Sequence, residues 1–384
     1  MPLRLDYDVY FPGGALWEEF TGVLARLGWN RRPQLVAQPM RNEVWKALEA
    51  GMVRGEHIRV PMLFIGGWYD IYADAVVSSF LEVREKGGER ARRHSRLIMG
   101  PWVHRTDQAQ NGELSFPGAA GYGMKRARAF LDACLRGIGA EAVEREPAIA
   151  YYQMGSSQWR SSALWPPADV RTEEFYLHPG GSLSSAKPSA AAEPAVFRFD
   201  PANPAPTVGG HVLDPGLRPG PADQREKVES RRDVVAFTGA VLDRDLAIAG
   251  RVTVRVYVST DQRDTDFTAV LTDVYPDGRS MLIGEGIRRM RFRNTTSRED
   301  LPASGEVYAA TINLDATAIT FLAGHRVRLL ISSSNHPRYA VNRNDGGPLY
   351  REGKGIVATN RVYHDAGRPS ALILPVAGQP SRDR

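Results

Sequence analysis

Cysteine is almost absent from this chain of 384 residues, which has a single one at position 134. One thiol cannot form a disulfide within the chain, and a zinc site built from thiolates needs several. Cys134 has no base beside it in the sequence, so we expect a small, buried, apolar residue rather than a nucleophile. A single cysteine does not decide between an oxidising and a reducing compartment, and the cytoplasm is slightly favoured.

Long apolar runs and clustered charge are also missing. No stretch approaches the roughly 18 consecutive apolar residues of a membrane span, and the first ten residues lack the basic start and apolar run of a secretory signal. The net charge of +5 is spread evenly, whereas a nucleic-acid-binding face needs gathered positive charge. The composition predicts a soluble globular protein with neither a membrane nor a nucleic-acid partner.

A strand, a helix and a second strand are predicted in the first third of the chain. The apolar run at 60–67 ends in two glycines, which is typical of a parallel strand covered on both faces. Residues 74–86 follow with a helical stripe, and residues 95–99 predict the next strand. Such a βαβ unit has parallel strands. The predicted helical stripe consists of Val76, Val77, Phe80, Leu81 and Val83.

From about residue 147 the pattern changes to short alternating runs separated by turns. Residues 251–259 place four valines on one face, and Tyr275–Gly278 predicts a turn with Pro at its second position. An all-β sandwich of jelly-roll type is therefore expected over 147–376. Residues 201–231, rich in Pro and Gly, predict a long irregular connection over the surface, and residues 377–384 a frayed tail. The expected fold class is α/β plus all-β.

Ligands of parallel sheets sit at the carboxyl ends of the strands, and here those ends carry GGWYD at 66–70 and GPWVH at 100–104. A histidine base needs a carboxylate on one ring nitrogen so that the other can accept a proton. Asp70 followed by His104 is the later part of the Ser…Asp…His order of an α/β-hydrolase. Taken alone, the two residues are a weak signal, because Asp and His after strands more often cap helices or bind backbone.

Longer strings strengthen the hypothesis. GGWYD, GPWVH, FLDACLRG at 130–137, YYQMGSSQWR at 151–160 and GPADQREKVESRRDV at 220–234 resemble the cocaine esterase and X-prolyl dipeptidyl-peptidase family of serine hydrolases, over roughly 58–375. The resemblance implies an α/β-hydrolase domain with a helical cap, joined to a C-terminal jelly roll. It implies cleavage of acyl esters or amides, of N-terminal dipeptides ending in proline, or of β-lactam side chains. By position, Asp70 would orient and His104 would be the general base.

The resemblance also divides the chain. It implies a helical cap remnant at 1–57, with helices expected at 15–27 and 43–53, the C-terminal part of the α/β-hydrolase domain at 58–146, and the jelly roll at 147–376. The family's nucleophile is the Ser of a G-x-S-x-G turn upstream of the Asp, and no such string exists here. Two parallel strands cannot form a complete hydrolase sheet. We therefore expect the C-terminal portion of a longer protein, inactive alone as a hydrolase.

Other residues receive weaker interpretations. Trp68, Tyr69 and Trp102 either line an acyl pocket or wall the interface between the sheet and the β domain. His325 and His336 are expected to be structural. Asp266, Asp273 and Asp277 with Asn335 lack a calcium-loop spacing and are taken as turn and cap residues, so no metal or organic cofactor is expected.

Two further functions stay open. The chain could be a non-catalytic binding or interaction module, in which the jelly roll recognises carbohydrate or a partner subunit. It could also be half of a split enzyme whose serine comes from a separate polypeptide. The expected ligands are small esters, amides or short peptides, and association into a homo-oligomer is open.

Overall fold

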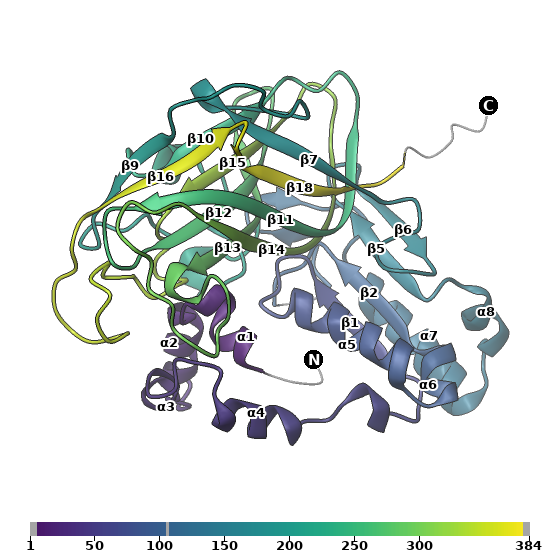
Figure 1. Ribbon diagram of the computed structural model, residues 1–384. Coiled ribbons are helices and arrows are strands. Elements are labelled where there is room, and N and C mark those ends of the chain that lie inside the picture. The colour runs from purple at the N-terminus through teal and green to yellow at the C-terminus, as the bar shows by residue number, and fades with distance from the viewer. Residues whose placement is uncertain (1–5, 105–106, 379–384) are drawn as a thin grey trace.

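The computed structural model describes residues 6–104 and 107–378, which form a small α/β part and a large β domain (Figure 1). The predicted fold class, α/β plus β, is confirmed by the separation of the strands into a mixed four-stranded sheet and a much larger one. Of the predicted tail at 377–384, only Ala377 and Gly378 lie within the described residues. The Ala377 N–H donates to the Ala247 carbonyl at 2.9 Å.

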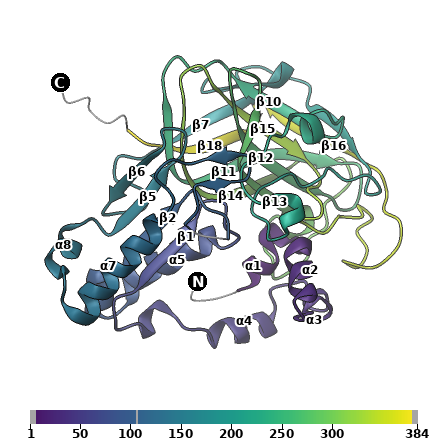
Figure 2. The same ribbon diagram turned by 180° about the vertical axis from the view of Figure 1, so that it is seen from behind.

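The small sheet has the strand order β1-β2-β5-β6. β1 and β2 are parallel, β5 is parallel to β2, and β6 returns antiparallel to β5. Helices α5 and α7 lie on opposite faces of this sheet (Figure 2). Two short strands, β3 and β4, form a separate hairpin. The strand bounds are β1 Leu63–Gly67, β2 Arg96–Gly100, β3 Gln110–Asn111, β4 Leu114–Ser115, β5 Ile149–Gln153 and β6 Gln158–Ser162.

The sheet of the α/β part extends beyond residue 146, the boundary predicted from the sequence. β5 pairs with β2 through Leu97 and Ile149, and β6 continues the same sheet to Ser162. All five residues of β5 are buried. The change from helical to alternating pattern marks where helices stop, and it carries no information on which sheet the next strand joins.

Helix α5 begins one residue before the predicted start and ends at the predicted residue. It buries Val76, Val77, Phe80 and Val83, whereas Leu81 is 37% exposed. Leu81 was placed on the buried stripe by the sequence pattern, but it follows Phe80 by one residue and so points about 100° away from it. The helix therefore contacts the sheet along a narrower stripe than predicted.

Short helices make up most of residues 7–50. The expected helices at 15–27 and 43–53 are observed as the shorter α2 and α4. Asn42 is the N-cap of α4, and its Oδ1 accepts the Val44 N–H at 3.1 Å. None of the helices among the described residues combines the length and apolarity required to cross a bilayer. The bounds are α1 Tyr7–Tyr10, α2 Glu18–Arg26, α3 Arg32–Val36, α4 Glu43–Ala50, α5 Ala73–Lys86, α6 Glu89–His94, α7 Tyr122–Arg136 and α8 Ala140–Arg145.

The β domain is one hydrogen-bonded sheet that curls around an apolar core (Figure 1). Its order is β13-β12-β15-β10-β8-β7-β18-β11-β16-β17, with β14 on β11 and β9 on β16. The predicted turn joins β12 to β13, where the Gly278 N–H donates to the Tyr275 carbonyl at 2.9 Å. The bounds are β7 Arg171–His178, β8 Ser182–Ser184, β9 Ala195–Phe199, β10 Val235–Gly239, β11 Leu246–Thr260, β12 Asp266–Val274, β13 Ser280–Arg289, β14 Tyr308–Phe321, β15 Arg326–Ser332, β16 Ala358–Asp365, β17 Arg368–Pro369 and β18 Ala371–Val376.

The connection at 201–231 is irregular, as predicted, but it does not simply run over the surface. His211, Val212, Ala222 and Gln224 are buried. The His211 ring Nε2 lies 2.8 Å from the Trp68 carbonyl oxygen, so this connection packs between the β domain and the small sheet. Its Pro and Gly content fixes turns, and turns can be buried where their polar groups find partners.

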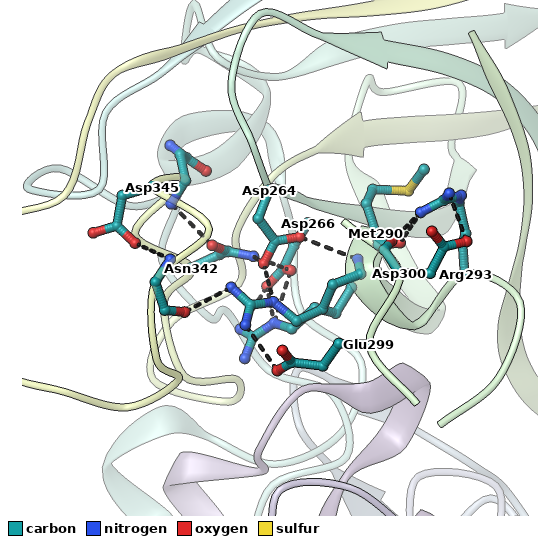
Figure 3. A network of polar contacts seen from close by, with 12 residues as sticks. Asp264, Asp266, Met290, Arg293, Glu299, Asp300, Asn342 and Asp345 are labelled. Atoms are coloured by element: carbon teal, nitrogen blue, oxygen red, sulfur yellow. Dashed lines mark hydrogen bonds and ion pairs between the residues drawn. The ribbon is translucent and has the colours of Figure 1, made fainter. Parts of the chain in front are cut away.

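A network of buried charges joins β12 and the segment after β13 to the loop that follows β15 (Figure 3). Arg289 donates to both carboxylate oxygens of Asp266, at 2.9 and 2.8 Å. Arg291 donates to Asp264 at 2.6 Å. The Asn342 side-chain amide donates to both acids, at 3.0 and 2.8 Å, so the loop is held by satisfied polar groups.

We expect Asp264→Ala to lower the free energy of unfolding by about 3–5 kcal/mol, because Arg291 then loses its buried charge partner. Chemical denaturation measures the change through the midpoint at a constant slope. The control Asp277→Ala removes a carboxylate from an exposed pair with Arg279 and should shift the midpoint far less, because solvent screens exposed pairs. Equal losses for the two variants would contradict a stabilising role for the network.

Candidate active site

The carboxyl ends of β1 and β2 lie side by side at one end of the small sheet. The two strands pair in parallel register, with Gly66 opposite Met99 and Gly67 opposite Gly100. The pairing continues past the strands, because the Trp68 N–H donates to the Gly100 carbonyl at 2.8 Å and the Tyr69 N–H to the Trp102 carbonyl at 3.0 Å. The loops that carry Asp70 and His104 therefore leave the sheet side by side.

Two glycines allow this close approach of the loops. A Cβ atom at Gly67 would lie 2.1 Å from the Trp102 carbonyl oxygen, and one at Gly100 would lie 2.3 Å from the Trp102 indole. Either distance is far below van der Waals contact. The backbone geometry that brings the two loops together therefore excludes any side chain at these positions.

Asp70 and His104 meet just beyond these strand ends. The His104 Nδ1 lies 3.2 Å from the Asp70 Oδ1. The Asp70 side chain is only 8% exposed, whereas the His104 side chain is 48% exposed. The same Oδ1 accepts the Tyr72 backbone N–H at 2.9 Å, which fixes the carboxylate at the start of the loop before α5. A buried carboxylate thus holds one nitrogen of a half-exposed imidazole.

The Asp70 carboxylate changes the acidity of the imidazole. Its hydrogen bond to the ring and its negative charge raise the pKa of His104 above the usual range, and partial burial of the ring opposes this shift. A neutral His104 donating through Nδ1 would leave the lone pair of Nε2 available. The pair has the arrangement of a general base with an orienting acid.

Two polar residues further along the chain, Asp107 and Asn111, bind backbone N–H groups of other segments, and the sequence pattern indicated neither of them. Asp107 Oδ1 accepts the Gly123 N–H at 2.7 Å and its Oδ2 accepts the Met124 N–H at 3.3 Å, so it caps the start of α7. Asn111 Oδ1 accepts the Val103 N–H at 3.4 Å. An acidic residue directly before a helix is a recognisable capping signal in a sequence. Asp107 lies 16 residues before Gly123, so the sequence alone could not indicate this cap.

The three aromatic residues beside the pair are buried. Trp68 and Tyr69 lie where the small sheet meets the β domain, and Trp102 lies inside the α/β part, against Trp159 and Gly123. Trp68 stacks on Trp165 with ring centroids 5.3 Å apart. The Tyr69 hydroxyl donates to the Leu282 carbonyl at 3.0 Å, and Trp102 packs against Trp159. Trp68 and Trp102 are fully buried and Tyr69 is nearly so. Trp68 and Tyr69 have the surroundings of a wall between the sheet and the β domain, whereas Trp102 packs within the α/β part.

The remaining candidate residues lie apart from Asp70 and His104. His325 is buried with its Nδ1 2.9 Å from Asp273, inside the β domain. Asp266 binds Arg289, and Asp277 binds Arg279 across a turn. Within residues 6–104 and 107–378, no three His, Cys, Asp or Glu side chains gather in a way that could hold a metal ion. Cys134 is exposed on α7, so the prediction of a buried thiol was wrong.

Another carboxylate–histidine contact lies beside the Asp70 loop, because His211 packs against Tyr69. His211 Nδ1 is 3.8 Å from Glu285 Oε1, and Glu285 forms a buried ion pair with Arg338. Although burial opposes ionisation, the Arg338 charge and the His211 contact lower the pKa of Glu285 to about 2. All three side chains are nearly inaccessible, so this cluster supports the loop rather than offering a site to a substrate.

Comparison with known proteins points to one family. Residues 17–106 match the family described as X-Pro dipeptidyl-peptidase (S15 family), and residues 141–373 match the X-Pro dipeptidyl-peptidase C-terminal non-catalytic domain. The cocaine esterase of Rhodococcus sp. (strain MB1 Bresler) is 34% identical over 357 residues, which are 89% of this chain and 61% of that protein.

Solved structures share the fold over nearly the whole chain. An α-amino acid ester hydrolase superposes with a TM-score of 0.80 at 26% identity, covering 98% of this chain and 65% of that one. An aminopeptidase from a Thaumarchaeota archaeon superposes with a TM-score of 0.84 at 22% identity, covering 98% of this chain and 71% of that one. The chain spans less than two thirds of the length of the cocaine esterase and of the ester hydrolase.

We expect Asp70→Asn to lower the pKa of His104 toward about 6.5, because the ring loses the charge that favours its protonated form. Imidazole chemical shifts followed against pH by NMR measure it. Since the folded-state pKa is raised, the stabilisation from the pair is complete below about pH 6.5 and is lost as the pH rises through that pKa. Glu144→Gln, which removes a carboxylate 3.6 Å from His94, should leave the His104 titration unchanged.

Proposed function

The chain belongs to the cocaine esterase and X-Pro dipeptidyl-peptidase family, and from this premise we propose that it supplies the acid and the base of a serine hydrolase. The proposed substrates are acyl esters or amides, or short peptides. The observation that carries the proposal is the 3.2 Å contact between His104 Nδ1 and Asp70 Oδ1, at the ends of adjacent parallel strands. The base is half exposed and its acid is buried, as a proton-transferring pair requires.

In the proposed reaction, His104 Nε2 takes the proton of a serine hydroxyl while the serine oxygen attacks the carbonyl carbon of the substrate. Asp70 holds the Nδ1–H and stabilises the imidazolium that forms. His104 then gives the proton to the leaving alcohol or amine, whose bond to the acyl carbon breaks. Water releases the acyl group from the serine in a second cycle, with His104 again taking and returning one proton.

We propose that the serine lies outside these 384 residues, in a segment that completes the sheet at β1. No G-x-S-x-G string is present. Among the strands of the described residues, β1 pairs only with β2, so its outer edge is open for another strand. Met124, Leu131 and Leu135 of α7 are more than half exposed on one side of the helix, an apolar stripe that such a segment would cover.

The domain division that goes with this proposal has a cap remnant at 1–57, hydrolase elements at 58–146 whose sheet β5 and β6 extend to Ser162, and a jelly roll over the remainder to 376. The β domain acts as support for the site. Its Leu282 carbonyl accepts the Tyr69 hydroxyl, and His211 binds the Trp68 carbonyl, so both contacts fix the strand end that leads to Asp70. Their role is to keep the Asp70 loop in place.

Fluorophosphonate labelling, read by intact mass, tests the proposal. We expect no labelling of the chain alone, and labelling of a version extended upstream by a serine-bearing sheet segment, because a fluorophosphonate reacts with a serine activated by a base. In the extended protein, His104→Ala should abolish labelling. His94→Ala, a histidine on α6 that contacts Glu144 instead, is the matched control and should label normally.

Robust labelling of a serine in the 384-residue chain would overturn the placement of the nucleophile outside it. Labelling that requires a separately expressed serine-bearing polypeptide would identify a split enzyme. If neither the extended chain nor such a mixture is labelled, the hydrolase proposal fails. The chain would then be a non-catalytic module that recognises carbohydrate or a partner subunit.

A further inference from the structure

Tyr72 contacts both Asp70 and His104. It lies in the turn between β1 and α5, and its backbone N–H donates to Asp70 Oδ1 at 2.9 Å. This is the oxygen that lies 3.2 Å from His104 Nδ1. The Tyr72 ring packs against the His104 ring with centroids 5.7 Å apart and planes at 69°, an edge-to-face arrangement. One residue thus fixes the carboxylate through its backbone and touches the imidazole through its side chain.

The two contacts on His104 restrict different motions. A hydrogen bond to Asp70 constrains the position of Nδ1, but coupled changes in the two side-chain torsions of His104 can still swing the ring while Nδ1 stays near Oδ1. Edge-to-face packing against an aromatic ring has a preferred angle and restricts that swing. Because the His104 side chain is 48% exposed, few neighbours can restrict it, and the direction of Nε2 depends strongly on Tyr72.

Tyr72 is itself held by the N-terminal helices. Phe20 of α2 packs edge to face against the Tyr72 ring, with centroids 6.3 Å apart and planes at 88°. Phe20 belongs to a buried apolar cluster with Trp17 and Ile71, and Tyr72 and Leu24 pack against this cluster. A chain of aromatic contacts therefore runs from α2 through Tyr72 to the imidazole.

The ring of Tyr72 provides these contacts, and its hydroxyl is not needed for them. Burial, assisted by Tyr10 and Asp70, raises the pKa of the Tyr72 hydroxyl to about 12, so the side chain is neutral over the physiological range. A phenylalanine at this position would keep the same edge-to-face geometry, whereas a leucine would keep apolar volume without an aromatic face.

We propose that Tyr72 is a positioning residue for the general base, and that helix α2 supports it through Phe20. The Tyr72 ring holds the His104 imidazole against Asp70 so that Nε2 keeps one direction. This inference rests on the proposed function, in which His104 moves the proton. Helix α2 would then act on His104 indirectly, because Phe20 contacts Tyr72 and Tyr72 contacts the imidazole.

The first experiment uses the 384-residue chain and needs no activity. Imidazole nitrogen chemical shifts, recorded by NMR against pH, report both the pKa of His104 and the tautomer of its neutral form. We expect the protein and Tyr72→Phe to give the same raised pKa and a dominant Nδ1–H tautomer. In Tyr72→Leu the pKa should fall toward its usual range and the tautomers should mix, because the ring no longer stays against Asp70.

Leu24→Ala is the matched control, because it removes packing from the same apolar cluster without touching His104. It should destabilise the protein while leaving the His104 tautomer and pKa as they are. An unchanged His104 in Tyr72→Leu would overturn the proposal. An equal change in Leu24→Ala would also overturn it, since the effect would then be general loosening of the cluster.

The second experiment separates this inference from the proposed function. In the upstream-extended protein, Tyr72→Leu should slow fluorophosphonate labelling on the order of 10- to 100-fold, the scale expected from a misplaced catalytic group. Tyr72→Phe should label at the rate of the parent. Shifted NMR titrations with no labelling even of the parent would support the positioning role and reject the hydrolase, whereas normal labelling of Tyr72→Leu would reject the positioning role.

Discussion

The structure depends on the close approach of two backbone segments at the ends of β1 and β2. Gly67 and Gly100 face each other in parallel register, and the space beside both is filled by Trp102. A side chain at either glycine would push the loops apart, and the 3.2 Å contact between His104 and Asp70 would be lost. The chemistry proposed here therefore begins with two positions where the fold tolerates only a hydrogen atom.

The β domain also helps to hold the ends of β1 and β2 in place, because it packs directly against the small sheet. A single buried apolar cluster contains residues of both sheets, from Phe64 on β1 to Leu374 on β18. The segment at 201–231 carries polar groups into this interface, where His211 binds the Trp68 carbonyl. Buried polar groups of this kind stabilise one arrangement of the parts, since any other would leave them unpaired. The domain described as non-catalytic in its family is thus part of what fixes the Asp70 loop.

The α/β part is asymmetric in how its surfaces are used. Its strand β5 contacts β14 of the β domain, whereas among the described residues β1 has a strand partner on one side only and Met124, Leu131 and Leu135 of α7 are more than half exposed. The half-exposed His104 follows β2, the strand that pairs with β1. The exposed base, the unpaired strand edge and the exposed apolar residues of α7 are the features on which the proposal of a further, serine-bearing segment rests.

The sequence by itself determined most of the local elements in the α/β part and the placement of Asp70 and His104 just after two of its strands. The apolar runs predicted β1 and β2, the helical stripe predicted α5 to within one residue, and the two strand-end motifs identified Asp70 and His104. Tertiary structure decided what periodicity cannot encode. It determined that β5 and β6 join the small sheet, that His211, Val212, Ala222 and Gln224 in the connection at 201–231 are buried, and that Leu81 and Cys134 are exposed. It also placed Tyr72 against His104. A sequence pattern reports which face of an element is buried, but the partner on that face comes from a distant segment and is fixed only when the chain packs.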